Sequence, residues 1–275
     1  MRSKLSLVLI ILLVFGLLLT SGCTSNKEVE EFRVGMECGY APFNWTQTDS
    51  SNGAVPIEGS TEFAGGYDVE IAKAIAKGLD KKLVIVKTEW DGLTPALLSG
   101  SIDAIIAGMS PTAERQKTID FSEPYYRSDL VMVVKAGSKY EKATSLADFS
   151  GAKITAQLNT FHYTVIDQIP NVDKQAAMAD FPAMRVALEA GIIDGYVSER
   201  PEGISAVEAN DNFAMVVFEE GKGFVASDED VAISVGLKKG NPDLVKKIND
   251  ILAKISEEDR IKLMDNAIKN QPAGK

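Results

Sequence analysis

The stretch Gly108-Met109-Ser110-Pro111-Thr112-Ala113-Glu114-Arg115 decides how this chain is interpreted. It follows the apolar run 102–107, which is rich in β-formers and too short for an ordinary helix, so the pattern predicts a buried strand that ends in a loop. In open α/β sheets, ligands bind at the carboxyl ends of strands. Arg115 would offer its planar guanidinium to an anion there, and hydroxyls and backbone N–H groups would complete the contact. The alternative is an ordinary surface salt bridge.

Strands and helices alternate around this stretch. We expect strands over 32–36 and 83–87, a helix over 68–77, and a second helix from Asp91 to residue 98 with Gly100 just past its end. Such alternation is typical of a largely parallel sheet, and therefore of the α/β class.

Residues 191–199 repeat the plan of residues 100–108. Each segment follows a predicted helix that contains a Pro-Ala pair, passes a glycine and an aspartate, and continues as a strand. Two lobes with related plans would explain the repeat, and Arg115 and Glu199 would then flank one cleft. Coincidence between two common helix-strand units is the alternative.

The C-terminal part continues the alternation. Residues 231–237 are predicted as a strand, and Asn241-Pro242 as the start of a helix that runs to about residue 255. A last helix is expected from Ser256, whose Ser-Glu-Glu-Asp sequence is close to a capping box.

The N-terminus has the features of an export signal. Arg2 and Lys4 precede an apolar run over 5–19, and a small-residue site follows with Cys23. This site resembles the lipobox of bacterial lipoproteins, so we expect residues 1–22 to be a signal peptide, Cys23 to carry lipid, and 23–31 to be a tether. An uncleaved membrane anchor is the alternative. Either way, the protein would lie at the outer face of a cell membrane.

Composition excludes several classes of function. Without Arg2 and Lys4, 27 basic residues stand against 39 acidic ones, a formal charge of −12 that would repel nucleic acid. Cys38 is the only other cysteine, so no intramolecular disulfide is expected once Cys23 carries lipid. With one histidine, no clustered ligand spacing and no P-loop sequence, neither a metal nor another cofactor is expected.

Together these motifs resemble the bacterial extracellular solute-binding proteins of family 3, which deliver polar amino acids to ABC importers. The resemblance covers essentially the whole mature chain. It rests on motifs over 37–43, 66–72, 90–97, and 110–115 with 119–126.

The resemblance implies a type II periplasmic-binding-protein fold, in which two α/β lobes are joined by two hinge strands and the first lobe is built from both ends of the chain. It also implies a monomer that works with an ABC transporter permease. On this plan the limits are 32–130 and 231–275 for the first lobe, 135–227 for the second lobe, and 130–134 and 228–232 for the hinges.

The resemblance also assigns roles in a binding site for an amino acid. Arg115 would pair with the α-carboxylate, helped by the Ser110 hydroxyl and by the loop of Asn159 and Thr160. The α-ammonium would be held by Glu199 and the carbonyl of Gly108.

Four further residues match positions that contact the side chain of the ligand: Tyr40 and Trp90 would sandwich it, and Glu37 and Gln157 would read its far end. Met109 completes the expected set.

The charges in this set indicate the type of ligand. Glu37, Glu199 and Arg115 sum to −1, so a neutral ligand would leave a carboxylate buried without a partner. We therefore expect a cationic amino acid, with arginine before lysine or histidine. If Glu37 points to solvent or pairs with another cation, a neutral polar amino acid such as glutamine is the alternative.

An enzyme on the same fold, similar to a dehydratase of small cyclic acids, is the main alternative from another class. It would need a general acid or base, and the available groups are Glu37, Glu199 and His162. No nucleophile-base pair is visible, so we expect no enzyme and place His162 in the structure or at the rim of the cleft. A sensory module of a membrane receptor is disfavoured because no later apolar run could span a membrane.

Overall fold

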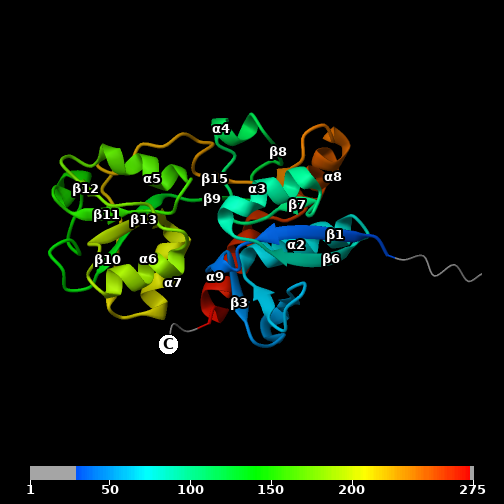
Figure 1. Cartoon of the computed structure of the whole chain (residues 1–275), viewed down its shortest axis with the longest axis horizontal. Coiled ribbons are helices and arrows are strands. Elements are labelled where there is room, and N and C mark those ends of the chain that lie inside the picture. The colour runs from blue at the N-terminus through cyan, green and yellow to red at the C-terminus, as the bar shows by residue number, and fades with distance from the viewer. Residues whose placement is uncertain (1–28, 273–275) are drawn as a thin grey trace, which may run out of the picture.

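Two five-stranded sheets with their helices lie side by side in the chain, each forming one lobe (Figure 1). The computed structural model describes residues 29–272, so the predicted signal peptide and Cys23 lie outside the described residues. The strand orders are β6-β1-β7-β16-β8 in the first lobe and β12-β11-β13-β10-β14 in the second. This is the mixed α/β architecture expected for a type II periplasmic-binding-protein fold.

The first sheet is parallel on one side and antiparallel on the other. Strand β1 pairs in parallel with β6 and β7, and β16 pairs antiparallel with β7 and β8. The elements of this lobe are β1 (Glu31–Met36), α2 (Tyr67–Gly78), β6 (Lys82–Lys87), α3 (Trp90–Ser99), β7 (Ala104–Ile105), α4 (Ala113–Gln116), β8 (Asp120–Phe121), β16 (Gly236–Leu237), α8 (Pro242–Leu252) and α9 (Glu257–Asn270).

A small antiparallel sheet is attached to the first lobe. It contains β2 (Gly39–Tyr40), β3 (Asn44–Gln47), β4 (Val55–Pro56) and β5 (Phe63–Gly65), with the 3-10 turn η1 (Ser51–Gly53) between β3 and β4.

The sheet of the second lobe contains one strand that runs antiparallel to both of its neighbours. Strand β10 pairs with both β13 and β14, and β11 pairs in parallel with β12 and β13. Its elements are β10 (Leu130–Lys135), η2 (Leu146–Phe149), β11 (Lys153–Thr155), α5 (Phe161–Val165), η3 (Ile166–Gln168), β12 (Asp173–Lys174), α6 (Phe181–Glu189), β13 (Gly195–Glu199), α7 (Arg200–Ala209) and β14 (Phe213–Val216).

Two short strands connect the lobes. β9 (Tyr126–Arg127) pairs antiparallel with β15 (Ala232–Ile233) between the two sheets (Figure 1). The stretch 130–134, expected as one hinge, lies inside β10 of the second sheet, whereas 228–232 overlaps β15. The expected lobe limits remain a prediction.

Local sequence signals account for the helix ends. The Asn241 side chain accepts a hydrogen bond from the N–H of Leu244 at the start of α8, and Ser256 accepts one from Asp259 at the start of α9. Gly100 ends α3 in the left-handed conformation, with φ of 83°. The first helical residue of α3 is Trp90, one before the Asp91 expected as its cap.

Two predicted strands are shorter in the structure than in the sequence pattern. Within 102–107 only Ala104–Ile105 is a strand, although the N–H groups of Asp103 and Ile106 still donate to carbonyls of β1. The run 231–237 divides into β15 and β16, because its first part pairs with β9 and its second part with β7 and β8. One continuous strand could not pair both with β9 and with the first sheet.

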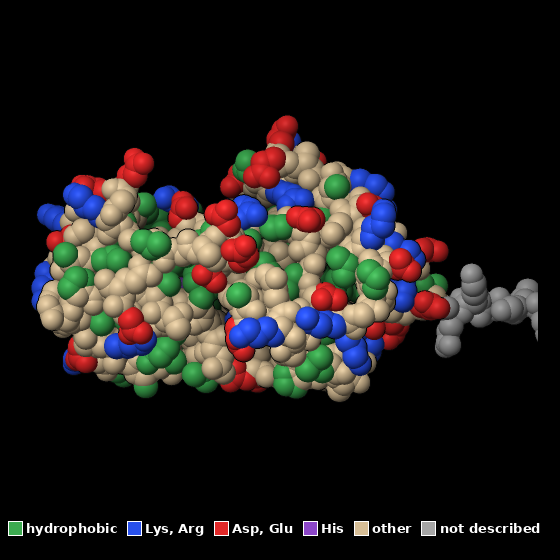
Figure 2. Space-filling model, turned by 90° about the horizontal axis from the view of Figure 1, so that it is seen from above, with side chains coloured by type: hydrophobic (Ala, Val, Ile, Leu, Met, Phe, Trp, Pro, Cys, Tyr) green, Lys and Arg blue, Asp and Glu red, His purple; other side chains and the backbone are tan. Residues whose placement is uncertain are grey.

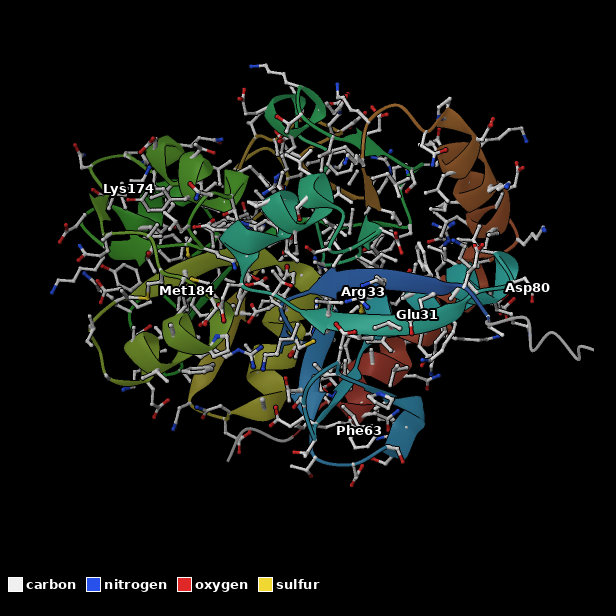
Figure 3. All side chains as sticks on the ribbon, turned by 45° about the vertical axis from the view of Figure 1, so that its right-hand side comes forward. Glu31, Arg33, Phe63, Asp80, Lys174 and Met184 are labelled. Atoms are coloured by element: carbon white, nitrogen blue, oxygen red, sulfur yellow. The ribbon has the colours of Figure 1, made fainter. Side chains whose placement is uncertain are left out.

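The apolar core reaches from one lobe into the other. A large cluster fills the first lobe and continues to Phe181 and Met184 of α6, while a second cluster lies wholly in the second lobe. Figure 3 labels Met184 on α6, Arg33 on β1 of the first lobe, and Lys174 at the far side of the second lobe. The ring of Tyr40 stacks on that of Phe181 with centroids 4.3 Å apart, so apolar packing joins the lobes.

The last residues described also join the lobes. Gln271 follows α9, and its Nε2 donates to the carbonyl of Ser205 on α7 of the second lobe at 3.2 Å. The surface viewed in Figure 2 carries acidic and basic side chains intermixed, with a notch at the upper edge where the lobes meet. Within residues 29–272, no helix has the length and apolar character needed to cross a bilayer.

Candidate ligand-binding cleft

A small cavity lies between the lobes and receives side chains from both. Seven predicted residues line it: Tyr40, Trp90, Gly108, Ser110, Arg115, Gln157 and Thr160. Three residues outside the predicted set complete the lining: Phe161, His162 and Phe181. A larger, open hollow of about 1290 Å³ beside α8 and the connecting strands contains none of the predicted residues, so size alone would have indicated the wrong place.

Arg115 is held in position by the stretch that precedes it. The Thr112 side chain accepts a hydrogen bond from the backbone N–H of Arg115 and so caps α4. The guanidinium donates to the Ser110 carbonyl at 2.9 Å and lies 4.9 Å from the centre of the Trp90 ring. Burial lowers the pKa of Arg115 to about 10, against the attraction of Glu199, so the side chain is still a cation at neutral pH.

The second lobe meets Arg115 through the loop before α5. Arg115 also donates to the carbonyl of Asn159 at 3.2 Å, and the Asn159 side chain donates to Asp91 of the first lobe at 2.8 Å. Asn159 has a φ of 56°, the left-handed conformation that asparagine tolerates better than most residues. The Thr160 hydroxyl is bonded within its own loop, to the Gln157 carbonyl at 2.7 Å.

Glu199 lies at the end of β13 in contact with two residues that line the cavity, Tyr40 and His162, and only 2% of it is exposed. The Tyr40 hydroxyl donates to its Oε2, and His162 Nε2 lies 3.0 Å from its Oε1. Burial alone would raise the pKa of Glu199. The charge of His162 and the hydrogen bonds from His162 and Tyr40 outweigh this and lower the pKa below its usual value.

His162, expected in the structure or at the rim of the cleft, is buried, lines the cavity and lies 3.0 Å from Glu199. A usable signal was its position, two residues after Thr160 in a loop already expected at the site.

Gly108 is supported from behind by a buried hydrogen-bond chain. Its φ is 62°, and a Cβ atom there would lie 2.6 Å from Cε1 of Tyr40, so only glycine fits. The Gly108 N–H donates to the Tyr125 hydroxyl at 3.3 Å, and that hydroxyl donates to Asp68 at 2.7 Å. Asn44 donates to the other Asp68 oxygen at 2.8 Å. Burial raises the pKa of Asp68 to about 6, although these hydrogen bonds oppose the shift.

The motifs over 66–72 and 119–126 therefore support the site through Asp68 and Tyr125 from below its surface. Met109 has a similar place, because it is buried and its carbonyl accepts the N–H of Ser234.

Glu37 and Gln157 meet across the lobes. Gln157 Nε2 donates to Glu37 Oε1 at 2.8 Å and to the Ala179 carbonyl at 3.0 Å. Among the described residues, the second oxygen of Glu37 has no partner. Burial raises the pKa of Glu37 to about 8, and the nearby carboxylates of Asp180 and Glu89 add to this against the Gln157 hydrogen bond. In this arrangement Glu37 is mostly protonated at pH 7, so the charge of −1 counted from the sequence does not hold.

The aromatic residues differ in what they offer the cavity. The Tyr40 ring stacks on Phe43 at 4.9 Å and on Phe181 at 4.3 Å, so protein rings occupy its faces and its hydroxyl is the part that reaches Glu199. Trp90 faces the Arg115 guanidinium. The sandwich expected from Tyr40 and Trp90 is not formed in this arrangement.

The chain is similar to known transport proteins along both lobes. A model of bacterial extracellular solute-binding proteins, family 3, matches residues 32–267. The chain is 30% identical to the L-cystine-binding protein TcyJ of Escherichia coli K12, over 84% of this chain and 80% of the relative. It is 31% identical to the ABC transporter glutamine-binding protein GlnH of Bacillus subtilis 168, over 79% of this chain and 77% of the relative.

Among solved structures, an amino acid ABC transporter substrate-binding protein of Streptococcus pneumoniae bound to L-arginine superposes with a TM-score of 0.76 at 26% identity. That match covers 87% of this chain and 94% of the streptococcal one. With the family match spanning both lobes and the cleft between them, the chain belongs to family 3 of the bacterial extracellular solute-binding proteins.

Proposed function

We propose that this protein captures a polar amino acid between its two lobes and delivers it to an ABC importer. One observation supports this most directly: Arg115 of the first lobe and His162 of the second line one cavity, and His162 lies 3.0 Å from the Glu199 carboxylate. A zwitterionic head group removed from water needs both of its charges matched, and Arg115 and Glu199 offer one partner for each. Closure of the lobes would satisfy both ends together, so the ligand would favour the closed form.

The proposed ligand is a cationic amino acid, arginine before lysine or histidine. Glu37 has one oxygen without a partner among the described residues, and a guanidinium beside it would favour its ionised form. A charge-assisted hydrogen bond from the cation would then offset the free-energy cost of burying this carboxylate.

Glutamine is the second candidate, and the same residues favour it in another protonation state. A protonated Glu37 can donate to an amide oxygen, and Gln157 beside it can donate or accept. The relatives described above bind cystine, glutamine and arginine by name, which suits either choice. They are named as transport proteins, and we propose no enzymatic role.

A thermal-shift screen of the twenty amino acids tests this function. A ligand at 100 times its Kd adds about 2.7 kcal/mol to the stability of the native state. L-arginine should give the largest shift, and calorimetry should then yield one site per chain. A largest shift with glutamate, or no shift with any amino acid, would refute the proposed ligand class.

For export and anchoring, we propose that residues 1–22 are removed and that Cys23 carries lipid at the outer face of the membrane. We also propose that the protein works as a monomer with its permease. Cys23→Ser should release the protein from the membrane fraction of expressing cells. If the variant stays there, the uncleaved anchor is the better explanation.

A further inference from the structure

Glu199 already has a protein partner on each of its oxygens. Tyr40 occupies Oε2 from the first lobe, and His162 approaches Oε1 from within the second lobe. An α-ammonium that uses Glu199 must therefore share this carboxylate with His162. The sequence holds no other histidine, and His162 is 5% exposed.

The imidazole can meet an ammonium in two opposite ways. With a proton on Nε2 it donates to Glu199 and takes the place of a ligand N–H. With Nε2 unprotonated, its lone pair accepts an N–H while another N–H of the same ammonium goes to Glu199. Among the described residues, Nδ1 of His162 has no hydrogen-bond partner, and Nε2 lies 3.0 Å from Glu199 Oε1 without hydrogen-bond geometry, so no contact fixes which nitrogen holds the proton.

We propose that His162 controls the ammonium end of the site, accepting an N–H of the bound amino acid when neutral and excluding it when protonated. This inference rests on the proposed function. Two starting states have to be considered when the amino acid binds. A neutral imidazole moves its proton from Nε2 to Nδ1 through solvent, with no net proton release, and an imidazolium releases one proton.

The proposal predicts the direction of a pH dependence. The complex holds fewer protons than the free protein, so affinity falls as pH falls. The other charged or titratable groups near His162 are Glu199 of β13, Tyr40 of β2 and Arg115 of α4. Asp68 and Glu37, more distant, also titrate between pH 5 and 9, so the effect of His162 has to be isolated by substitution.

The test compares the whole chain with its His162→Gln variant, which keeps a neutral donor and acceptor at this position. Calorimetry gives the Kd of L-arginine for both proteins at pH 8.0, 7.0, 6.0 and 5.5. From pH 7.0 to 5.5, the Kd of the parent should rise about tenfold relative to that of the variant, because the parent has to release a proton when the amino acid binds. 5-Guanidinopentanoate, which lacks the α-ammonium, should show no such difference between the two proteins.

A ratio of the two Kd values that stays within twofold at every pH would overturn the proposal. If His162→Gln fails to fold, His162→Asn, which also carries a neutral donor and acceptor, replaces it in the same comparison, with the same supporting and overturning outcomes. Failure of the parent to bind any amino acid at pH 8.0 would refute the proposed function itself, whereas binding with equal pH slopes refutes only the role of His162.

Discussion

The two walls of the cleft are built in different ways. Arg115 is fixed mainly by its own stretch, because its guanidinium bonds to the carbonyl of Ser110, five residues earlier. Glu199 depends on Tyr40, 159 residues away in the sequence, and on His162. One wall is thus centred on a local motif, while the other combines a contact within the second lobe with one from the first. The variants below test this difference.

Removing Arg115 should have the largest effect. Loss of one partner of a buried charge pair typically costs about 3–5 kcal/mol, so Arg115→Ala should weaken amino acid binding at least a hundredfold by calorimetry. Arg33→Ala is the matched control, because Arg33 lies on β1 of the first lobe (Figure 3), does not line the cavity and pairs with Glu58. An affinity of Arg115→Ala within a few-fold of the parent, with an unchanged circular dichroism spectrum, would contradict the carboxylate role.

Glu199→Gln should break the second wall less severely. Its amide retains one acceptor, and Tyr40 and His162 stay beside it, so we expect a loss of about 2–3 kcal/mol in ligand binding. Glu219→Gln provides a control in the same lobe, since Glu219 is exposed and pairs with Lys222. If Glu199→Gln binds as tightly as the parent, the ammonium is held elsewhere.

Glu37→Gln should stabilise the protein without ligand while weakening its binding of arginine. Because burial raises the pKa of Glu37 to about 8, folding at high pH must protonate a carboxyl that is ionised in the unfolded chain. This cost grows as pH rises from the unfolded pKa of about 4.3 towards 8, and it is absent below pH 4.

Urea unfolding at pH 4.5 and 8.0 measures this difference. The stability gained in Glu37→Gln should be on the order of 4 kcal/mol at pH 8.0 and well under 1 kcal/mol at pH 4.5. Calorimetry at pH 8.0 should show weaker binding of arginine and little change for glutamine. Equal changes for the two amino acids would contradict the role of Glu37 in choosing the ligand.

Tyr40→Phe should have the smallest effect. It removes the hydroxyl on Glu199 and keeps the stacking on Phe43 and Phe181, so a loss of about 0.5–1.5 kcal/mol is expected. The value is measured as the change in ligand Kd. A loss as large as that of Glu199→Gln would mean that Tyr40, rather than the carboxylate, is the main contact.

The same contrast explains how far the sequence could predict the structure. The helix ends at Gly100, Asn241 and Ser256 follow from nearby residues, and the motif around Arg115 is contiguous. The division of 231–237 into two strands depends on which strands lie beside it, and no local pattern contains that information.

The site shows the same limit. Arg115 and Gln157 were expected at the cavity and line it, whereas the place of His162 beside Glu199 could not be predicted because that contact is a tertiary one. The raised pKa of Glu37 could not be predicted for a related reason. It results from burial, and a count of carboxyl groups in the sequence does not show how deeply each one is buried. Charge counts become reliable only when the depth of each group is known.

The hydrogen bond between Gln271 and Ser205 couples the residue after α9 to the second lobe. Helix α9 belongs to the first lobe, yet the residue that follows it is hydrogen-bonded to α7 of the second. If the lobes rotate apart, this bond must stretch, break or carry the last turn of α9 with it. An environment-sensitive fluorophore placed just beyond Gln271 would therefore report lobe movement from a point remote from the cleft. A bulky fusion at the same place would disturb the contact between the lobes.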